Sequence, residues 1–439
     1  MKRYESYKDS GVKWLGEIPG HWEVIRLKAL LIERIEKNNN KENLIILSLL
    51  KDKGIIPYDE KGAIGNNSKE DLSQYKIARK GDLVINSMNV IIGSVGITQY
   101  DGYISPAYYS FKPRGIINLI YYYYLMTLRS VQQSIRCYSK GIMEIRLRIT
   151  SNDFLSMPFP FPPKSEQTAI ANYLDSVTSK IDKAISQQQK MIDLLNERKQ
   201  IIIQNAVTKG LDPNAKMKDS GVEWIGEIPE NWEVYNFGRL ISLLTDYTAN
   251  GSFGDLAKNI HYQNEGYARL VRLTDLRENL NNIGVWVDKH GYDFLSKSWL
   301  KGGELLIANV GAYSGLPCIM PKVPYPTTLA PNMFLLKLNE SKIYTKYIYY
   351  LLLSNCYFNW LQTIATSSAQ PKLNKDNIRQ LIIIHPINIK DQYDIVLYIK
   401  KKLHPIDESI SQCNKMISLL QERKQIIIND VVTGKVKVI

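Results

Sequence analysis

The sequence predicts an α+β protein in which two globular α/β domains are separated by two long helices that form an antiparallel coiled coil. Two internal repeats predict this arrangement. Residues 8–24 read KDSGVKWLGEIPGHWEV and residues 218–234 read KDSGVEWIGEIPENWEV, with 13 identities in 17 positions. The segment MIDLLNERKQIII at residues 191–203 recurs as MISLLQERKQIII at residues 416–428. The sequences between these repeats differ, so one pseudo-twofold scaffold is expected to carry two different surfaces.

The chain divides where its composition changes. We predict a first domain at residues 1–164, which ends in the proline-rich stretch Met157–Pro163, because prolines at this density continue neither a helix nor a central strand. Residues 165–210 are predicted to form the first long helix, residues 211–389 the second domain and residues 390–439 the second long helix.

The first helical segment contains neither proline nor glycine from Ser165 to Val207, and its apolar residues recur at the spacing of coiled-coil a and d positions. One amphipathic helix cannot bury its apolar stripe alone, so the two helices should pack on each other; the alternative is two independent helices, each packed on its own domain. Pro405 should kink or interrupt the second helix near its start. The predicted coiled-coil and subunit-interface residues are Leu174, Val177, Ile181, Met191, Leu195, Ile202, Ile406, Met416, Leu420 and Ile427.

The composition favours a cytoplasmic protein with a polyanionic partner. The hydrophobic content of 44% is that of a globular chain. No apolar run approaches the roughly 18 residues of a membrane span, and the N-terminal sequence lacks the apolar core of a signal peptide. The four cysteines and five histidines show no metal-ligand spacing, so no metal site is expected. The net charge of +13 favours nucleic acid as a partner, although a soluble basic protein can carry the same charge.

Each domain shows a charged turn, a short apolar strand and a polar, glycine-bearing loop. Residues 80–85 lead into such a loop at 86–96, and residues 301–307 lead into another at 308–315. Each domain then carries a tyrosine-rich helix, IYYYYLMTL or YTKYIYYLLL. Packing in the core is the favoured interpretation of these tyrosines, and a stacking platform for bases is the alternative.

Catalytic motifs are missing from the sequence. We find no GxxxxGK[ST] phosphate loop, no GxGxxG at the start of a helix and no Asp/Asn-Pro-Pro-Tyr/Phe tetrad of adenine methyltransferases. Paired carboxylates and nucleophile–histidine pairs are not evident either. Two domains without catalytic chemistry, a basic charge and a helical spacer indicate a recognition protein.

Several motifs together resemble the specificity subunit of type I restriction–modification systems over nearly the whole chain. They are SGVKWLGEIP at 10–19 with its repeat, LNERKQ at 195–200, GDLVIN at 81–86, SPAY at 105–108, ANVGA at 308–312, LAPN at 329–332 and PKLN at 371–374. Most such chains have Pro-Pro-x-x-x-Glu-Gln before the second helix. Here residues 382–392 keep only the Asp391-Gln392 end, so the sequence leaves the start of that helix open.

The resemblance implies a mechanism. Each target-recognition domain would read one half of a bipartite, asymmetric DNA sequence, and the helices would set the gap and dock two methyltransferase subunits. Two restriction subunits can join such a complex. The resemblance implies that this chain binds no cofactor and catalyses nothing; S-adenosylmethionine, ATP and Mg are expected on the partner subunits. Two alternatives stay open: a self-sufficient DNA-modifying enzyme with an unrecognised site, and a bipartite binding or scaffold protein without a modification role.

The predicted DNA-binding residues come from the polar loops and from late segments of each domain. Asn and Gln suit adenine and Arg suits guanine, although Arg and Lys often hold only phosphate. Arg269 and Arg272, predicted on one face of a strand, are weaker candidates. The predicted set is Asn86, Ser87, Asn89, Lys140, Arg146 and Arg148 in the first domain, and Asn309, Tyr313, Ser314, Gln370, Lys372 and Asn374 in the second.

Overall fold

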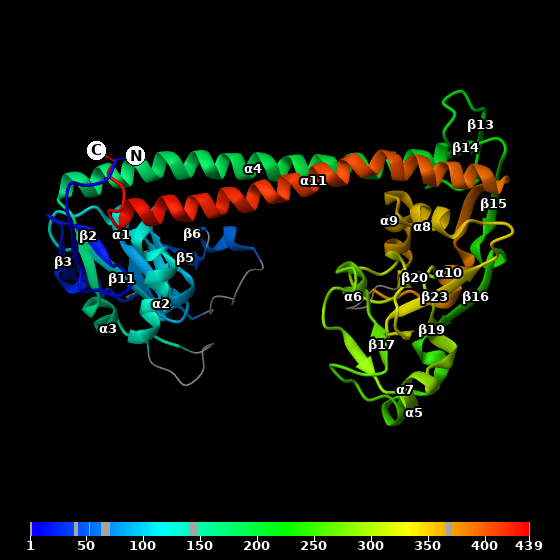
Figure 1. Ribbon diagram of the computed structural model, residues 1–439, viewed down its shortest axis with the longest axis horizontal. Coiled ribbons are helices and arrows are strands. Elements are labelled where there is room, and N and C mark those ends of the chain that lie inside the picture. The colour runs from blue at the N-terminus through cyan, green and yellow to red at the C-terminus, as the bar shows by residue number, and fades with distance from the viewer. Residues whose placement is uncertain are drawn as a thin grey trace. The chain divides into compact units, whose positions relative to one another are not determined.

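The computed structural model of the chain describes residues 2–38, 43–51, 53–62, 71–139, 147–365 and 371–438. The chain forms two compact units, which are Met1–Gln189 with Asn414–Ile439, and Lys190–Cys413. Each unit contains one domain and segments of two long helices, α4 (Lys164–Lys209) and α11 (Ile389–Val432), as Figure 1 shows. The predicted helical segments were 165–210 and 390–439, and the compact units divide each helix between them.

The first unit contains two four-stranded sheets. One has the order β4 (Leu31–Glu33), β11 (Tyr108–Pro113), β8 (Leu83–Asn86), β9 (Val95–Ile97). The other has the order β6 (Gly54–Pro57), β5 (Ile45–Leu50), β10 (Gly102–Ile104), β7 (Lys76–Ala78), with β5 and β10 parallel. Two-stranded ribbons join β1 (Tyr7–Asp9) to β2 (Glu17–Pro19) and β3 (Glu23–Arg26) to β12 (Pro158–Phe161). The short helices are α1 (Leu119–Met126), α2 (Arg129–Tyr138) and α3 (Ser151–Ser156).

The second unit repeats this sheet topology. Its first sheet has the order β16 (Ile241–Asp246), β23 (Met333–Leu338), β20 (Leu305–Ala308), β21 (Pro317–Ile319). Its second sheet has the order β18 (Val285–Val287), β17 (Ala268–Val271), β22 (Thr327–Leu329), β19 (Trp299–Leu300), with β17 and β22 parallel. The ribbons are β13 (Met217–Asp219) with β14 (Glu227–Pro229) and β15 (Trp232–Asn236) with β24 (Ile382–Pro386). The helices are α5 (Phe253–Asn259), α6 (Leu273–Arg277), α7 (Lys289–Phe294), α8 (Thr345–Leu353), α9 (Asn355–Ile364) and α10 (Lys375–Gln380).

The tyrosine-rich helices α1 and α8 belong to the core, as the favoured interpretation predicted. Tyr121 and Tyr347 are fully buried. The Tyr121 hydroxyl donates to the carbonyl of Val432 at 2.9 Å, and the Tyr347 hydroxyl donates to the carbonyl of Val207 at 3.2 Å. A buried hydroxyl needs such a partner, and here the partner is the end of a long helix. Each tyrosine therefore fixes a long-helix terminus to the domain of the same unit.

Two glutamines fix the starts of the long helices. The buried Gln167 side chain accepts from the Asn118 backbone N–H at 2.9 Å and donates to the Pro162 carbonyl at 2.8 Å. In the second unit, Gln392 accepts from the Tyr344 N–H at 2.8 Å and donates to the Pro386 carbonyl at 3.0 Å. The second helix thus begins at Ile389 with the same contacts as the first, although the proline pair of the usual motif is missing.

Within each unit, the two long-helix segments run antiparallel. In the first unit, Leu174 near the start of α4 shares a core with Val431 near the end of α11. In the second unit, Val207 near the end of α4 shares a core with Ile399 near the start of α11. Pro405 lies inside α11 without interrupting it, so the expected break is absent there. Pro405 is exposed, which lets solvent reach the backbone group that lacks a helical partner.

The register of the apolar stripe differs from the prediction at two of its positions. Met191 and Met416 are 49% and 48% exposed, whereas the following residue, Ile192, is buried. Ile417 is half-buried at the equivalent place. The coiled-coil positions are therefore Ile192 and Ile417, one residue after the predicted Met191 and Met416. The helical repeat brings Ile192 onto the face that carries Ile181. The other predicted interface residues, Leu174, Val177, Ile181, Leu195, Ile202, Ile406, Leu420 and Ile427, are buried or half-buried.

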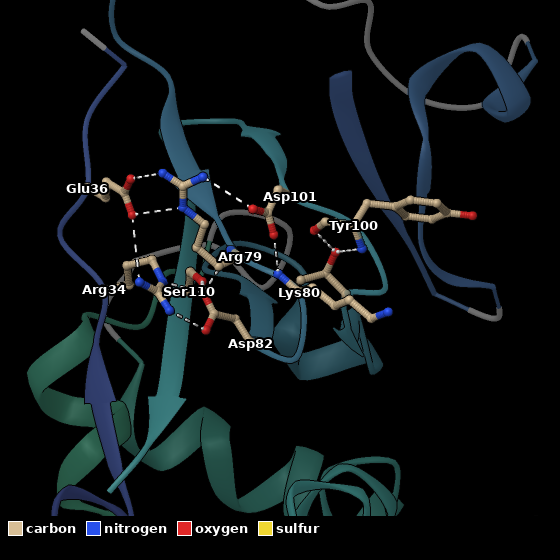
Figure 2. Close-up of polar contacts among 9 residues, drawn as sticks. Arg34, Glu36, Arg79, Lys80, Asp82, Tyr100, Asp101 and Ser110 are labelled. Carbon is tan, nitrogen blue, oxygen red and sulfur yellow. Dashed lines mark hydrogen bonds and ion pairs between the residues drawn. The ribbon is translucent and has the colours of Figure 1, made fainter. Parts of the chain in front are cut away.

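A buried carboxylate of the first domain binds residues in β11 and directly after β4 and β7, as Figure 2 shows. Asp82, which is 2% exposed and precedes β8, accepts two hydrogen bonds from the Arg34 guanidinium at 2.6 and 3.0 Å. The Ser110 hydroxyl of β11 and the Arg79 backbone N–H donate to the same carboxylate at 2.7 and 3.0 Å. The hydrogen bond to Asp82 raises the pKa of Arg34. Arg79 in turn contacts Glu36 and Asp101, so the network continues to the surface.

Candidate nucleic-acid interface

The polar loop of the first domain follows β8 directly. Asn86 and Ser87 are 6% and 4% exposed, and the Asn86 side chain accepts from the Met88 N–H at 3.0 Å, which shapes the turn. The Ser87 N–H donates to the Ala107 carbonyl and its carbonyl accepts from the Ile149 N–H, both at 3.1 Å. Asn89 is exposed. The backbone of this loop is therefore held from two sides, and Asn89 lies at its surface.

The loop of the second domain has the same backbone connections. The Asn309 N–H donates to the Asn332 carbonyl at 3.1 Å, and the Asn309 carbonyl accepts from the Leu373 N–H at 2.9 Å. Gly93 and Gly315 end the two loops with φ of 91° in each, a conformation that disfavours other residues. The structure therefore makes Asn309 the counterpart of Ser87, so the two domains present different side chains from one backbone frame.

A cavity of about 620 Å³ opens beside Asn309. Phe253 and Tyr262, which are 81% and 60% exposed, line it together with Asn332. The Tyr247 hydroxyl lies 3.4 Å from that of Tyr262, and burial raises the pKa of Tyr247. The cavity therefore combines exposed aromatic faces, on which a base could stack, with polar groups that could bind its edge.

Asn309 carries an unsatisfied polar atom. Its side chain is 9% exposed, and its Oδ1 atom has no hydrogen-bond partner among the described residues. A buried polar atom without a partner is costly, and a bound ligand can satisfy it. The amide is therefore poised to bind a group that enters the cavity, such as the exocyclic amine of a base.

The cavity lining is basic overall. Lys372 and Lys375 line it, and Asp246 is the single acidic residue among the described lining residues; the Lys375 ammonium lies 3.0 Å from the Asp246 carboxylate. The Asn374 side chain caps α10 by accepting from the Asn377 N–H at 2.8 Å, so this predicted DNA-binding residue shapes the helix start. Lys372 forms a backbone bridge with Val310, which joins this late segment to the Asn309 loop.

The first domain has a cavity of about 340 Å³ at the same place. Asn86 and Asn89 line it, as do Lys51 and Lys61, and its described lining contains no acidic residue. The counterpart cavities are therefore both cationic, while their polar and aromatic lining residues differ. The cavity beside the polar loop is therefore the candidate interface of each domain, and its lining residues differ between the two domains.

The remaining predicted residues either line neither cavity or fall outside the described residues. Arg148 is exposed, and its guanidinium lies 3.5 Å from the Met88 sulfur. Tyr313 is 44% exposed and lies under the Arg277 guanidinium at 4.4 Å. Ser314 is fully buried, so its side chain does not reach the surface. Lys140, Arg146 and Gln370 fall outside the described residues.

The prediction that Arg269 and Arg272 share one strand face is wrong. Arg269 lies in β17 and is 3% exposed, with its guanidinium donating to the Leu280 carbonyl at 2.8 Å. Arg272 follows the strand and pairs with Asp275 at the start of α6. The strand ends at Val271, so the expected alternation does not extend to Arg272. Both arginines are engaged in structural contacts.

The sequence did not predict the aromatic residues that line the second cavity, Phe253 and Tyr262, or the turn residue Asn332. Phe253 and Tyr262 lie far from the loop in sequence and carry no motif. Asn332 has a φ of 70°, and it follows Pro331 in the LAPN motif, which is the residue pair favoured by a turn with positive φ at its third position. That pair was a signal that could have indicated a tight turn beside the loop.

Part of the chain matches a family model, and nearly the whole chain matches two known proteins. Residues 19–191 match the type I restriction modification DNA specificity domain. The chain is 22% identical to the type I restriction enzyme MjaVIII specificity subunit of Methanocaldococcus jannaschii, over 98% of this chain and 97% of that protein. It is 24% identical to the putative MjaX specificity subunit of the same organism, over 98% of each chain. The chain is therefore similar to a specificity-domain model over residues 19–191 and to type I restriction enzyme specificity subunits over nearly its whole length.

A chain of known structure shares this fold. A chain from a solved type I R-M system matches with a TM-score of 0.67 at 12% identity, over 95% of this chain and 99% of that one. Among the described residues, no cluster of His, Cys, Asp and Glu could hold a metal ion. Every helix in the described part of the chain is too short or too polar to cross a membrane. The similarity to specificity subunits is consistent with a non-catalytic chain.

Proposed function

We propose that each domain of this specificity subunit binds one half of a bipartite, asymmetric DNA sequence through the cavity beside its polar loop. The observation that carries the proposal is the backbone equivalence of Ser87 and Asn309, which gives two different side chains the same support. Two domains built on one frame suit the dyad of duplex DNA, and different loop residues suit a site that is not palindromic.

The chemistry of the cavities supports recognition of DNA. The Asn309 amide can form a bidentate pair with adenine, and the exposed aromatic residues Phe253 and Tyr262 flank it. The lysines that line both cavities suit the phosphate backbone, which sets register without reading sequence. We infer that the long helices hold the two half-sites at a fixed separation.

A duplicated apolar stripe supports docking of two copies of one partner. Met191, Leu194 and Ile201 on α4 are 49%, 61% and 53% exposed. Their counterparts 225 residues later on α11, Met416, Leu419 and Ile426, are 48%, 50% and 52% exposed. Exposed apolar stripes of this kind mark protein interfaces. Since the stripe occurs once in each unit, two copies of the methyltransferase subunit are the proposed occupants.

The catalytic steps belong to those partners in this proposal. The methyltransferase subunits bring S-adenosylmethionine and methylate adenine N6, and two restriction subunits with ATP and Mg can add DNA cleavage. The specificity subunit supplies the target sequence and the assembly surface.

The test is long-read detection of N6-methyladenine in DNA from cells that express this chain, its methyltransferase subunit, or both. A split motif that is methylated only when both are present is the expected result. Methylation by this chain alone would identify a self-sufficient enzyme. Absence of methylation with both proteins soluble would favour a bipartite binding or scaffold protein.

A further inference from the structure

The second unit contains another basic cavity, between α8 and α11, which the proposed recognition of bases does not use. Its volume is about 370 Å³. Lys346 of α8 and Lys400 of α11 line it together with Tyr349, Tyr350 and Cys318. None of the described residues that line it is acidic. We call it the dibasic cavity.

The two lysines of the dibasic cavity repel each other. Burial and the neighbouring Lys346 ammonium both lower the pKa of Lys400. The charge of Asp407 acts on Tyr349 and Tyr350, which line the cavity. The Asp407 carboxylate is already paired with the Lys199 ammonium. Two amines that meet in one cavity without a lining carboxylate form a site that an anion would stabilise.

The first unit has the same fold but carries other residues at the positions of these two lysines. The counterpart of Lys400 is Asp175, 225 residues earlier, and the counterpart of Tyr350 is Tyr124, since both tyrosines stand three residues after the core tyrosine of their helix. The Tyr124 hydroxyl donates to the Asp175 carboxylate at 2.7 Å. Ile120 takes the place of Lys346. The second unit has thus replaced a tyrosine–carboxylate hydrogen bond with two cations.

The charge of Arg277 acts both on the loop that begins with Asn309 and on a residue that lines the dibasic cavity. The Arg277 guanidinium lies 4.4 Å from the ring of Tyr313, in the loop that begins with Asn309. Cys318 lines the dibasic cavity, and burial raises the pKa of its thiol to about 11, while the Arg277 charge acts in the opposite direction. Arg277 therefore contacts the loop, and its charge reaches a thiol that lines the dibasic cavity.

We propose that the dibasic cavity binds a backbone phosphodiester of the DNA whose bases meet the Asn309 loop, with Lys346 and Lys400 as its ligands. This inference rests on the proposed DNA-recognition function. A phosphate accepts hydrogen bonds from two ammonium groups and neutralises their repulsion. The shared Arg277 favours DNA over an acidic segment of a protein partner, because the loop and the cavity would then contact one continuous ligand. The phosphate contact would fix the register of the second domain without reading a base.

The test compares charge-removing variants of the complex with the methyltransferase subunit. The double variant Lys346→Gln/Lys400→Gln is measured against Lys390→Gln/Lys401→Gln, which removes two exposed charges from α11 outside the dibasic cavity. Binding to a duplex that carries the methylated motif and to one that lacks it is measured across salt concentrations. We expect the double variant to lose affinity for both duplexes by a similar factor. We also expect the slope of log affinity against log salt to fall by about 0.9 for each phosphate that the variant no longer neutralises.

The methylated motif should stay unchanged in that variant. The substitution Lys400→Asp provides a second variant, because it restores the carboxylate that pairs with tyrosine in the first unit, and it should show the same loss of DNA affinity. Salt slopes equal to those of the control pair would overturn the proposal. Unchanged DNA binding with weakened methyltransferase binding would assign the cavity to an acidic protein segment instead. If the unsubstituted complex shows no salt-dependent DNA binding, the proposed function and this inference both fail.

Discussion

Lys424 of α11 and Asp182 of α4 form an ion pair in the first unit, with the ammonium 2.7 Å from the carboxylate. Their counterparts 225 residues away, Lys199 and Asp407, form the same pair in the second unit with the helices exchanged. The exchange shows that each unit uses the same antiparallel register between its two long-helix segments. Each ion pair has one residue on α4, Asp182 in the first pair and Lys199 in the second. The length of α4 between these two residues therefore sets how far apart the pairs lie along that helix.

The length of that segment should set the gap in the DNA target. Insertion of four residues within 186–198, with a matched insertion within 411–423, adds about 6 Å of helix, which corresponds to about two base pairs. We expect a longer gap between unchanged half-sites, measured by mapping the methylated motif. Altered half-sites with the original gap would contradict the spacer role.

Removal of Asn309 should affect one half-site only. In Asn309→Ala, the amide that lines the cavity of the second domain is lost, and we expect about 1–3 kcal/mol less discrimination at one base pair of one half-site. The readout is the motif methylated in cells. The matched substitution Ser87→Ala lies at the equivalent backbone position of the first domain, so any relaxation it causes should fall in the other half-site.

The exposed apolar stripes should control assembly. Substitution of Leu194 by Glu places a charge in one stripe, and Leu419→Glu does the same in the other. We expect each to weaken binding of one methyltransferase copy by about 2 kcal/mol, because a charge is desolvated in an apolar interface. Native mass spectrometry should detect complexes with a single methyltransferase. Ile116→Glu, at an exposed apolar residue of the first domain, should leave assembly intact.

The Asp82 carboxylate of the first domain should depend on its arginine. The substitution Arg34→Ala leaves a buried charge with its bidentate partner removed, and we expect a loss of about 3 kcal/mol in the free energy of unfolding. Denaturant unfolding of the first domain measures the loss. Arg26→Ala, at an exposed arginine of the neighbouring ribbon, is the control, and a similar loss there would show that the Asp82 pair is not special.

Acid stability of the second domain should depend on Asp275. Burial raises the pKa of this carboxyl, but hydrogen bonds from Arg272 and Asn282 outweigh burial and leave the pKa below its ordinary value of 3.8. A lowered folded-state pKa stabilises the fold above the unfolded-state pKa, and this contribution disappears as the pH falls through the folded-state value. Asp275→Asn should therefore be less stable than the unsubstituted chain at pH 7, and the difference should shrink below about pH 4. A difference that is constant with pH would contradict this assignment.

Local patterns in the sequence account for much of the helical frame. The repeated segments and the absence of proline and glycine between Ser165 and Val207 predicted the first long helix. The register of its apolar stripe did not follow from the sequence, because Met191 and Ile192 are both apolar. The sequence alone therefore does not show which of these two residues faces the partner helix and which faces outward. Burial of Ile192 and exposure of Met191 emerged only from the packing.

The amino-acid sequence by itself determined that one frame occurs twice and carries two different domains, since repeats and helix periodicity are properties of neighbouring residues. The tertiary structure alone decided which residues meet at each cavity. Asn309, Phe253 and Asn332 come together because strands and loops distant in the chain pack against each other. It also made Asn309 the counterpart of Ser87, and it brought Lys346 of one helix to Lys400 of another. Such contacts depend on chain folding over long separations, which local sequence patterns do not encode.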